Sequence, residues 1–401
     1  MKKVLSILLA LLLVCGALPF AAAAGSAKEL RFRDDGTFRV LQLSDTQDDA
    51  YPAENMLELV RRSIEFSDPD LIVISGDLVE DSRIGDVNID RQPGREGVNA
   101  EDLMGELDAA QTRANVEKAV DAVFSEIEKY AVPYVIALGN NDRKVGLTGA
   151  DWLEIFAKYP HCIAFDESDD AQDGVDYHVT VKGTDGADKL NVWLLDTCRG
   201  GISDEQVDWY RETSKALTAA NGGEPIPALA FQHIQIAEIG NLFEPCKMTD
   251  EGAKKADKGF VRLNKEIARG YNMFSYEPGR SSYEFAAFKE CGDVMALFFG
   301  HQHVEGFSGV WDGIELGFTY GCEMAKSGPY GFRVFTLNER NVREYQNVLY
   351  RYTGSVKVGN VKITPEENLP YYEYPNELAT LLMKIAYFFA AVVGTVVNLF
   401  R

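Results

Sequence analysis

The fold of this chain is decided by a short apolar run that ends in a glycine and a carboxylate, LIVISGD at residues 71–77. Four further segments share this design, with a run rich in Val, Leu, Ile or Phe that ends in metal-ligand residue types: VLQLSDTQ (40–47), VIALGNND (135–142), LAFQH (229–233) and LFFGHQH (297–303). Runs of this composition predict buried strands. Because open α/β sheets place their ligands beyond the carboxyl ends of the strands, we expect the five ends to meet in one cleft.

The polar residues at these ends are suited to a metal centre. They are Asp45, Asp77, Asn140, His233, His301 and His303. Carboxylate, amide and imidazole ligands in this mixture suit Mn, Fe, Zn or Mg, and one shared carboxylate could bridge two ions. Any one segment alone could simply end in a residue that caps a loop, but five in series favour a metal site.

The ordered set resembles the calcineurin-like metallophosphoesterases, whose segments read D-x-H, G-D, G-N-H-D, a lone His and G-H-x-H. The resemblance extends from about Phe38 to Val348, and further matches at LLDT (194–197) and ISDEQ (202–206) indicate the branch related to purple acid phosphatases. It implies an α/β (α+β) fold, a β-sandwich flanked by helices, with a dinuclear metal site at the carboxyl ends of the strands.

The resemblance also implies a role for each residue. Asp77 would be the carboxylate that bridges the two ions. The remaining ligands would be Asp45, Gln47 and His303 for the first ion, and Asn140, His233 and His301 for the second. Asn141 and Asp142 occupy the catalytic positions, with Asp142 orienting its neighbours. The cofactors would be two divalent or trivalent metal ions, and a metal-bound hydroxide would attack phosphorus.

Two residues depart from the family pattern. Gln47 stands where the family has a metal-binding His, and Asn141 stands where it has the catalytic His. Glutamine can still offer a carbonyl oxygen, and Glu80 could supply a compensating carboxylate. The change at Asn141 is more serious, because an amide cannot act as a general acid near neutral pH.

We therefore expect a phosphoesterase that acts on a small phosphate mono- or diester, best on one with a leaving group of low pKa. The alternatives are a catalytically silent surface binding module of the same fold, or another metal-dependent hydrolase. Arg143, Arg199 and Arg280 are each candidates to bind a phosphate. The formal net charge of −22, from 62 acidic and 40 basic residues, argues against nucleic acid as a partner, since its binding needs Lys and Arg stripes.

The two ends of the chain predict its location. Residues 1–24 have the basic start, apolar run and small-residue cleavage site of a signal peptide of bacterial type, so we expect export to the cell surface or medium. A lipoprotein attached through Cys15 is the alternative. A metallophosphoesterase domain would follow at 30–350, then a linker at 351–377. The apolar segment 378–401 would associate with a membrane as a spanning or interfacial helix, or else form a buried terminal helix.

Helical spacing at 53–67, and a long helix that ends near Tyr130, separate the first three apolar runs and predict βαβ units. The stretch from 81 to about 105 predicts a loop. Ser203 and Gln206 form a capping-box pattern that predicts the start of a helix. Five cysteines remain beyond the signal peptide, and we expect them to be mostly buried and reduced.

Overall fold

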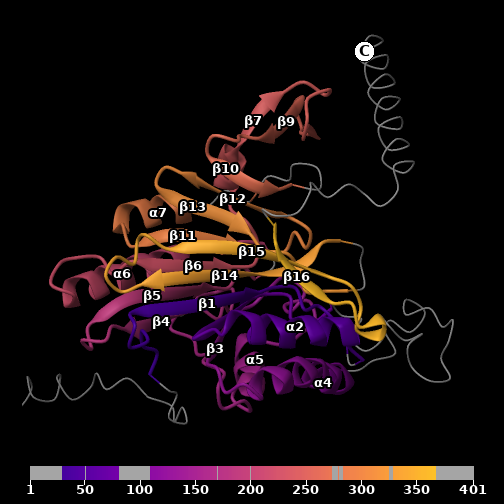
Figure 1. Ribbon diagram of the computed structural model, residues 1–401. Helices are drawn as coiled ribbons and strands as arrows, with labels where there is room; N and C mark the ends of the chain where they lie inside the picture. Colours follow the sequence, from indigo (N-terminus) through magenta and orange to yellow (C-terminus); the bar gives the residue numbers. More distant parts are fainter. Residues whose placement is uncertain are drawn as a thin grey trace, which may run out of the picture.

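Two mixed β-sheets pack face to face in the computed structural model, with helices on the outside of the sandwich (Figure 1). The structure describes residues 29–366 apart from 50, 81–108, 169, 199, 273–278, 280–282 and 325–327. The signal peptide at 1–24, the loop at 81–105 and the apolar segment at 378–401 therefore lie outside the described residues.

The first sheet has six strands in the order β16-β15-β14-β1-β2-β3. Their bounds are β1 Thr37–Leu43, β2 Leu71–Ser75, β3 Tyr134–Ala137, β14 Tyr330–Asn338, β15 Gln346–Thr353 and β16 Lys362–Pro365. Strands β1, β2 and β3 run parallel, and the helices α2 (Glu54–Ser67) and α4 (Ala109–Glu128) connect them. The predicted βαβ units are confirmed.

The second sheet has seven strands in the order β10-β12-β13-β11-β6-β5-β4. Their bounds are β4 Tyr177–Lys182, β5 Asp188–Leu195, β6 Ala228–Gln232, β10 Ala268–Tyr271, β11 Val294–Phe299, β12 Gly306–Trp311 and β13 Ile314–Phe318. The neighbours β5, β6 and β11 run parallel at its centre. Helices α6 (Asp204–Ala220) and α7 (Glu284–Cys291) flank this sheet, and Ser203 with Gln206 forms the predicted capping box of α6.

The remaining elements are smaller. Helix α5 (Gly149–Phe156) follows β3, and the 3₁₀ turns η2 (Ala237–Leu242) and η3 (Val356–Val358) lie in connections. A separate three-stranded sheet of β7 (Phe243–Cys246), β9 (Phe260–Leu263) and β8 (Lys254–Lys255) projects from the top of the molecule in Figure 1.

Aromatic side chains join the two sheets into one core. Phe335 of β14 meets Phe231 of β6 and Phe298 of β11 edge to face, with ring centroids 5.6 and 4.8 Å apart. Edge-to-face pairs at this separation add to the stabilisation that burial itself provides. Because the parallel strands of both sheets are locked together in this way, their carboxyl ends reach the same edge of the sandwich.

The domain continues beyond its predicted end at residue 350. β15 runs to Thr353 and β16 pairs with it, so the start of the predicted linker 351–377 belongs to the first sheet. This strand could not be predicted from the sequence, because Lys362–Pro365 is short and partly exposed at the sheet edge, without a buried apolar face.

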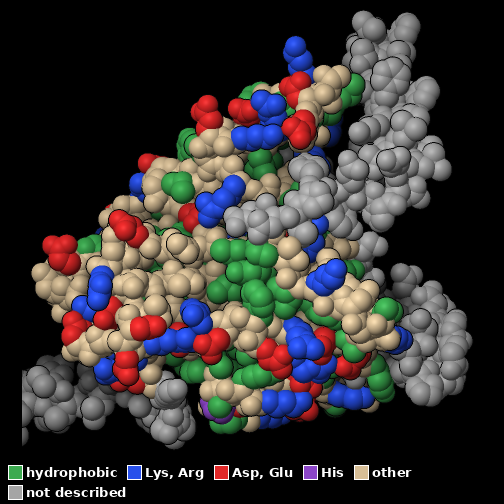
Figure 2. Space-filling model, viewed as in Figure 1, with side chains coloured by type: hydrophobic (Ala, Val, Ile, Leu, Met, Phe, Trp, Pro, Cys, Tyr) green, Lys and Arg blue, Asp and Glu red, His purple; other side chains and the backbone are tan. Residues whose placement is uncertain are grey.

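Three further features bear on function: the state of the cysteines, the character of the helices and the distribution of surface charge. All five cysteines of the described chain are free thiols, as expected, but only Cys198 and Cys322 are buried, so the expectation that most are buried was wrong. Among the helices that the structure describes, none combines the length and apolarity needed to cross a membrane. On the face in Figure 2, Lys and Arg side chains lie interspersed with Asp and Glu rather than in a continuous basic stripe.

Candidate metal centre

Five segments from the two sheets bring their polar ends together at one edge of the sandwich. Asp45 and Asp77 follow β1 and β2, Asn140 follows β3, His233 follows β6, and His301 follows β11. The packing of parallel strands explains the convergence, since every one of these strands points the same way into the shared edge.

Two groups of three potential ligands form there. Asp77, His233 and His301 make one triad, and Asp45, Asp77 and His303 make the other, with the ligand atoms of each within 4.8 Å of one another. Asp77 belongs to both. A carboxylate shared between two ligand sets is the arrangement that a pair of cations requires.

Short polar contacts hold the two carboxylates in place. Asp77 Oδ2 lies 3.1 Å from His233 Nε2, and Asp77 Oδ1 accepts a 2.8 Å hydrogen bond from the Asn141 backbone N–H. Asp45 Oδ2 accepts from the Ser44 hydroxyl at 2.6 Å, and the Asp45 carboxylate also accepts from the His301 backbone N–H at 3.1–3.2 Å. Both carboxylates are essentially fully buried, so each depends on these donors.

The protonation preferences of Asp77 and His301 fit ligand duty, whereas His233 would have to lose a proton to bind a cation. Burial opposes ionisation of Asp77, yet contact with His233 outweighs it and holds the pKa of Asp77 below its usual value. Burial disfavours the charged form of His233, but Asp77 and Asp45 raise its pKa to about 10. Burial and the neighbouring His233 lower the pKa of His301 to about 3. His301 is therefore a neutral imidazole, and Asp77 an anion.

Two histidines are oriented through their second ring nitrogen. His233 Nδ1 lies 2.9 Å from the Ser75 carbonyl oxygen, which turns Nε2 toward Asp77. His303 Nδ1 lies 2.6 Å from Glu323 Oε2, which turns Nε2 toward Asp45 at 3.4 Å. Such partners fix ring orientation and raise the basicity of the ligating nitrogen. Sequence reasoning missed Glu323, which follows β13 without any motif around it.

Glycines in the motifs permit the close packing of the ligands. A Cβ on Gly76 would lie 2.5 Å from His233 Nδ1, and one on Gly139 would overlap Asp77. The ligand residues themselves adopt left-handed backbone conformations, with φ of 49° at Asp45 and Asp77 and 68° at His301. Positive φ at non-glycine residues is uncommon and gathers at functional sites, where the surroundings hold it.

Asn140 and Gln47 are the two predicted ligands that lie outside the triads. The Asn140 side chain lies 2.9 Å from His301 Nδ1, where its nitrogen can donate to the ring and its oxygen could instead share a cation with it. Gln47 is 4% exposed, and its Oε1 finds no hydrogen-bond donor in the described structure. A buried carbonyl oxygen without a donor costs free energy unless a cation or donor meets it. Both amides thus fit metal-ligand positions.

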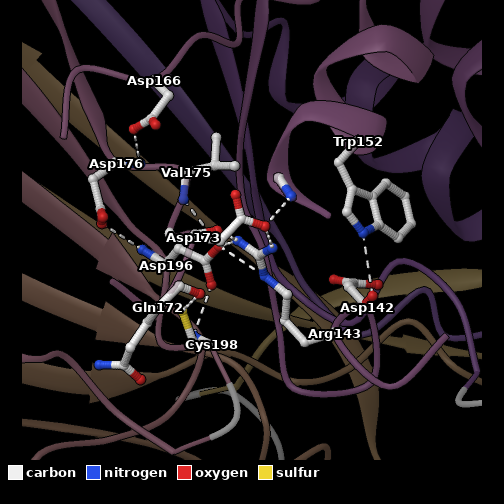
Figure 3. Close-up of polar contacts among 12 residues, drawn as sticks. Asp142, Arg143, Trp152, Asp166, Gln172, Asp173, Val175, Asp176, Asp196 and Cys198 are labelled. Carbon is white, nitrogen blue, oxygen red and sulfur yellow. Dashed lines mark hydrogen bonds and ion pairs between the residues drawn. The ribbon is translucent and has the colours of Figure 1, made fainter. Parts of the chain in front are cut away.

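Asp142 braces the loop that carries Asn140 and Asn141. Its Oδ1 accepts from the backbone N–H of Leu78 at 2.8 Å and its Oδ2 from that of Gly139 at 2.8 Å, so one carboxylate ties the loops after β2 and β3 together. Trp152 Nε1 donates to the Asp142 carbonyl at 3.2 Å (Figure 3). This geometry matches an orienting role.

Arg143 has an internal role that differs from the phosphate contact considered above. Its guanidinium pairs with the buried carboxylate of Asp196 and donates to the Asp173 carbonyl at 2.6 Å (Figure 3). The side chain is 6% exposed and points away from solvent. Arg199 and Arg280 fall outside the described residues.

Glu80, the compensating ligand considered from the sequence, and two further histidines, His161 and His178, lie outside the two triads. The backbone N–H of Glu80 bonds the Asp48 carbonyl at 3.2 Å. His161 and His178 pair with Glu128 and Glu167, at 2.5 and 2.7 Å.

Comparison with known proteins assigns the family. The model of the calcineurin-like phosphoesterases matches residues 38–305. The chain belongs to this family. It is 26% identical over 351 residues to a protein named probable inactive purple acid phosphatase 14 of Arabidopsis thaliana, covering 76% of this chain and 74% of that protein. It is also 24% identical over 364 residues to probable inactive purple acid phosphatase 29 of the same plant, covering 80% and 79%.

Among solved structures, a dimetal phosphatase from Danio rerio is similar in fold. It shares 13% identity and a TM-score of 0.44, and the match covers 77% of this chain and 98% of that one. The family match and the two plant relatives confirm the predicted family and its distant relation to purple acid phosphatases, and the two sheets with their flanking helices confirm the predicted fold.

Proposed function

We propose that this chain is an exported metal-dependent phosphoesterase that hydrolyses a small phosphate mono- or diester. The observation that carries the proposal is the pair of ligand triads that share Asp77. Two ions held there would activate a water molecule and offset the charge of the phosphoryl oxygens. Asp45, Gln47 and His303 would complete the first site, and Asn140, His233 and His301 the second.

The residues around the site would supply negative charge and hold the ligand side chains in position. Asp77 is kept anionic by His233 and by the Asn141 backbone N–H, so it can face two cations at once. Glu323 and the Ser75 carbonyl set the direction of two imidazoles before any ion arrives. Preorganisation of this kind lowers the cost of assembling a charged site.

Asn141 limits the range of substrates in this proposal. An amide at this position gives the leaving oxygen a hydrogen bond but no proton. Esters whose leaving oxygen has a low pKa should therefore react fastest. Export and a surface or membrane location are part of the proposal through residues 1–24 and 378–401.

A second function is favoured by the same residue. A catalytically silent module that binds a phosphate ligand would also lack the catalytic imidazole, and two relatives carry the word inactive in their names. Such a module would retain the metals and phosphate binding without turnover.

The experiment compares metal-stripped with Mn²⁺-loaded protein on p-nitrophenyl phosphate and its bis-ester. We expect turnover that requires the metal and is lost in Asp77→Asn, while Asp121→Asn on an exposed helical face behaves as wild type. If the wild type holds two ions, binds orthophosphate and hydrolyses neither ester, the silent module replaces the phosphoesterase.

A further inference from the structure

A lysine side chain folds back onto the residue that replaces the family's catalytic histidine. Lys144 Nζ donates to Asn141 Oδ1 at 2.7 Å, and its backbone N–H donates to the Asn141 carbonyl at 2.9 Å. With the Asn140 nitrogen directed at His301 Nδ1, the Asn140 oxygen lies 3.2 Å from the same ammonium. The ammonium therefore contacts the side-chain oxygens of both Asn141 and Asn140, and Asn140 is a predicted metal ligand.

The turn that carries this lysine is held by its neighbours in the chain. Asp142 bonds the backbone of two loops, and Arg143 is anchored by the Asp196 carboxylate, so both of these side chains point into the protein (Figure 3). Lys144 is the exposed member of the turn. A rigid turn with two buried anchors gives its third side chain a defined position at the edge of the metal centre.

The charge of this ammonium is not paired with any acid in the part of the chain that the structure describes. Within the described residues Lys144 forms no ion pair with a carboxylate, although the chain has 62 acidic residues. Several other lysines do so, among them Lys129 with Glu126 at 2.6 Å and Lys158 with Glu117 at 2.9 Å. An ammonium that is hydrogen-bonded to a neutral amide is not neutralised by a carboxylate, so its charge can attract an anionic ligand.

We propose that Lys144 takes over part of the role of the imidazole missing at position 141, with Asn141 as the residue that positions it. The inference rests on the proposed phosphoesterase function. The ammonium would donate a hydrogen bond to the leaving oxygen of the bound ester and offset the negative charge that develops there.

The step needs no proton from the lysine. Water supplies the oxygen that forms the new bond to phosphorus and releases its proton. The ester P–O bond breaks, its electron pair departs with the leaving oxygen, and that oxygen takes a proton from solvent. Lys144 keeps its three ammonium protons throughout. Because it acts through charge, its benefit should grow with the negative charge on the leaving oxygen.

The test is a leaving-group series on the Mn²⁺-loaded full-length protein. Lys144→Gln is expected to lower kcat/KM for phenyl phosphate by about 10- to 100-fold, the range of one charge-assisted hydrogen bond. The loss should shrink for dinitrophenyl phosphate. Lys144→Arg should retain most activity, and the matched control Lys129→Gln, on another exposed lysine, should equal wild type. A uniform loss across the series, or none, would overturn the inference.

A double-mutant cycle tests the positioning role of Asn141. Asn141→Ala keeps the backbone N–H that binds Asp77 but removes the amide that holds the ammonium. We expect Asn141→Ala to reproduce the leaving-group dependence of Lys144→Gln, and the loss in the double variant to be smaller than the sum of the two single losses. Additive losses would show that the two residues act separately.

If the proposed function fails, the role of Lys144 in binding phosphate can still be tested separately. If the metal-loaded wild type turns over no ester, the phosphoesterase proposal fails, and the affinity for orthophosphate becomes the test. Lys144→Gln should then weaken orthophosphate binding about tenfold, in keeping with loss of one charged donor, without changing the number of bound ions. An unchanged phosphate affinity would overturn the inference.

Discussion

Replacing Glu323 by glutamine should weaken one metal site and spare the other. Glu323 Oε2 lies 2.6 Å from His303 Nδ1, and His303 belongs only to the triad with Asp45 and Asp77. The glutamine side chain can still form a hydrogen bond to the His303 ring, but it lacks the negative charge that raises the basicity of the ligating His303 nitrogen. Removal of such a partner typically costs 10–100-fold in metal affinity, or about 1.4–2.8 kcal/mol.

The assay is calorimetric titration of chelator-stripped protein with Mn²⁺. The chain offers a matched control, because Glu128 Oε2 lies 2.5 Å from His161 Nδ1 in a similar histidine–carboxylate pair that has no place in the metal centre. We expect one of the two dissociation constants to rise 10–100-fold in Glu323→Gln, and neither to change in Glu128→Gln. Equal weakening of both sites, or of none, would refute the assignment of His303 to a single site.

Three further predictions follow from individual residues. Asn141→His should raise turnover of alkyl phosphates by roughly 10²–10⁴-fold, and much less for aryl phosphates; steady-state assays of both classes that show equal changes would exclude residue 141 as the missing acid. Burial and the nearby Asp196 hold the pKa of Asp176 well above its usual value. Its contribution to stability is therefore fully present below the pKa of the unfolded chain and is lost as pH rises toward the folded pKa. Urea unfolding of metal-stripped protein between about pH 4 and pH 7 should show wild type losing stability relative to Asp176→Asn, by up to about 1.4 kcal/mol per pH unit; parallel curves would contradict this. Deletion from Leu378 onward should move the protein from the membrane to the soluble fraction with its metal content intact, and loss of the fold instead would identify that segment as a core helix.

The strands and their polar ends could be predicted because the information is local. LIVISGD and its counterparts each combine a buried apolar run with the residue that follows it, so the type of element and the ligand are read from the same few letters. These ends are then expected to lie together, because the carboxyl ends of parallel strands share one edge of the sheet.

The parts that could not be predicted depend on contacts between distant segments. Glu323 has no motif, and only the fold brings it to His303. The partner of Arg143 is a carboxylate after β5, which no spacing in the sequence reveals. Lys144 reaches Asn141 only because a braced turn reverses the chain. Short, partly exposed strands such as β9 and β16 carry too little apolar pattern to be found in advance.

The number of metal ions bound by wild type and by Asp77→Asn shows whether one carboxylate serves both ligand sets. Elemental analysis of the Mn²⁺-loaded proteins, with phosphatase activity measured on the same samples, gives the number of ions per chain. We expect two ions and turnover for wild type, and at most one ion without turnover for Asp77→Asn. A variant that holds two ions and hydrolyses its ester normally would contradict this expectation.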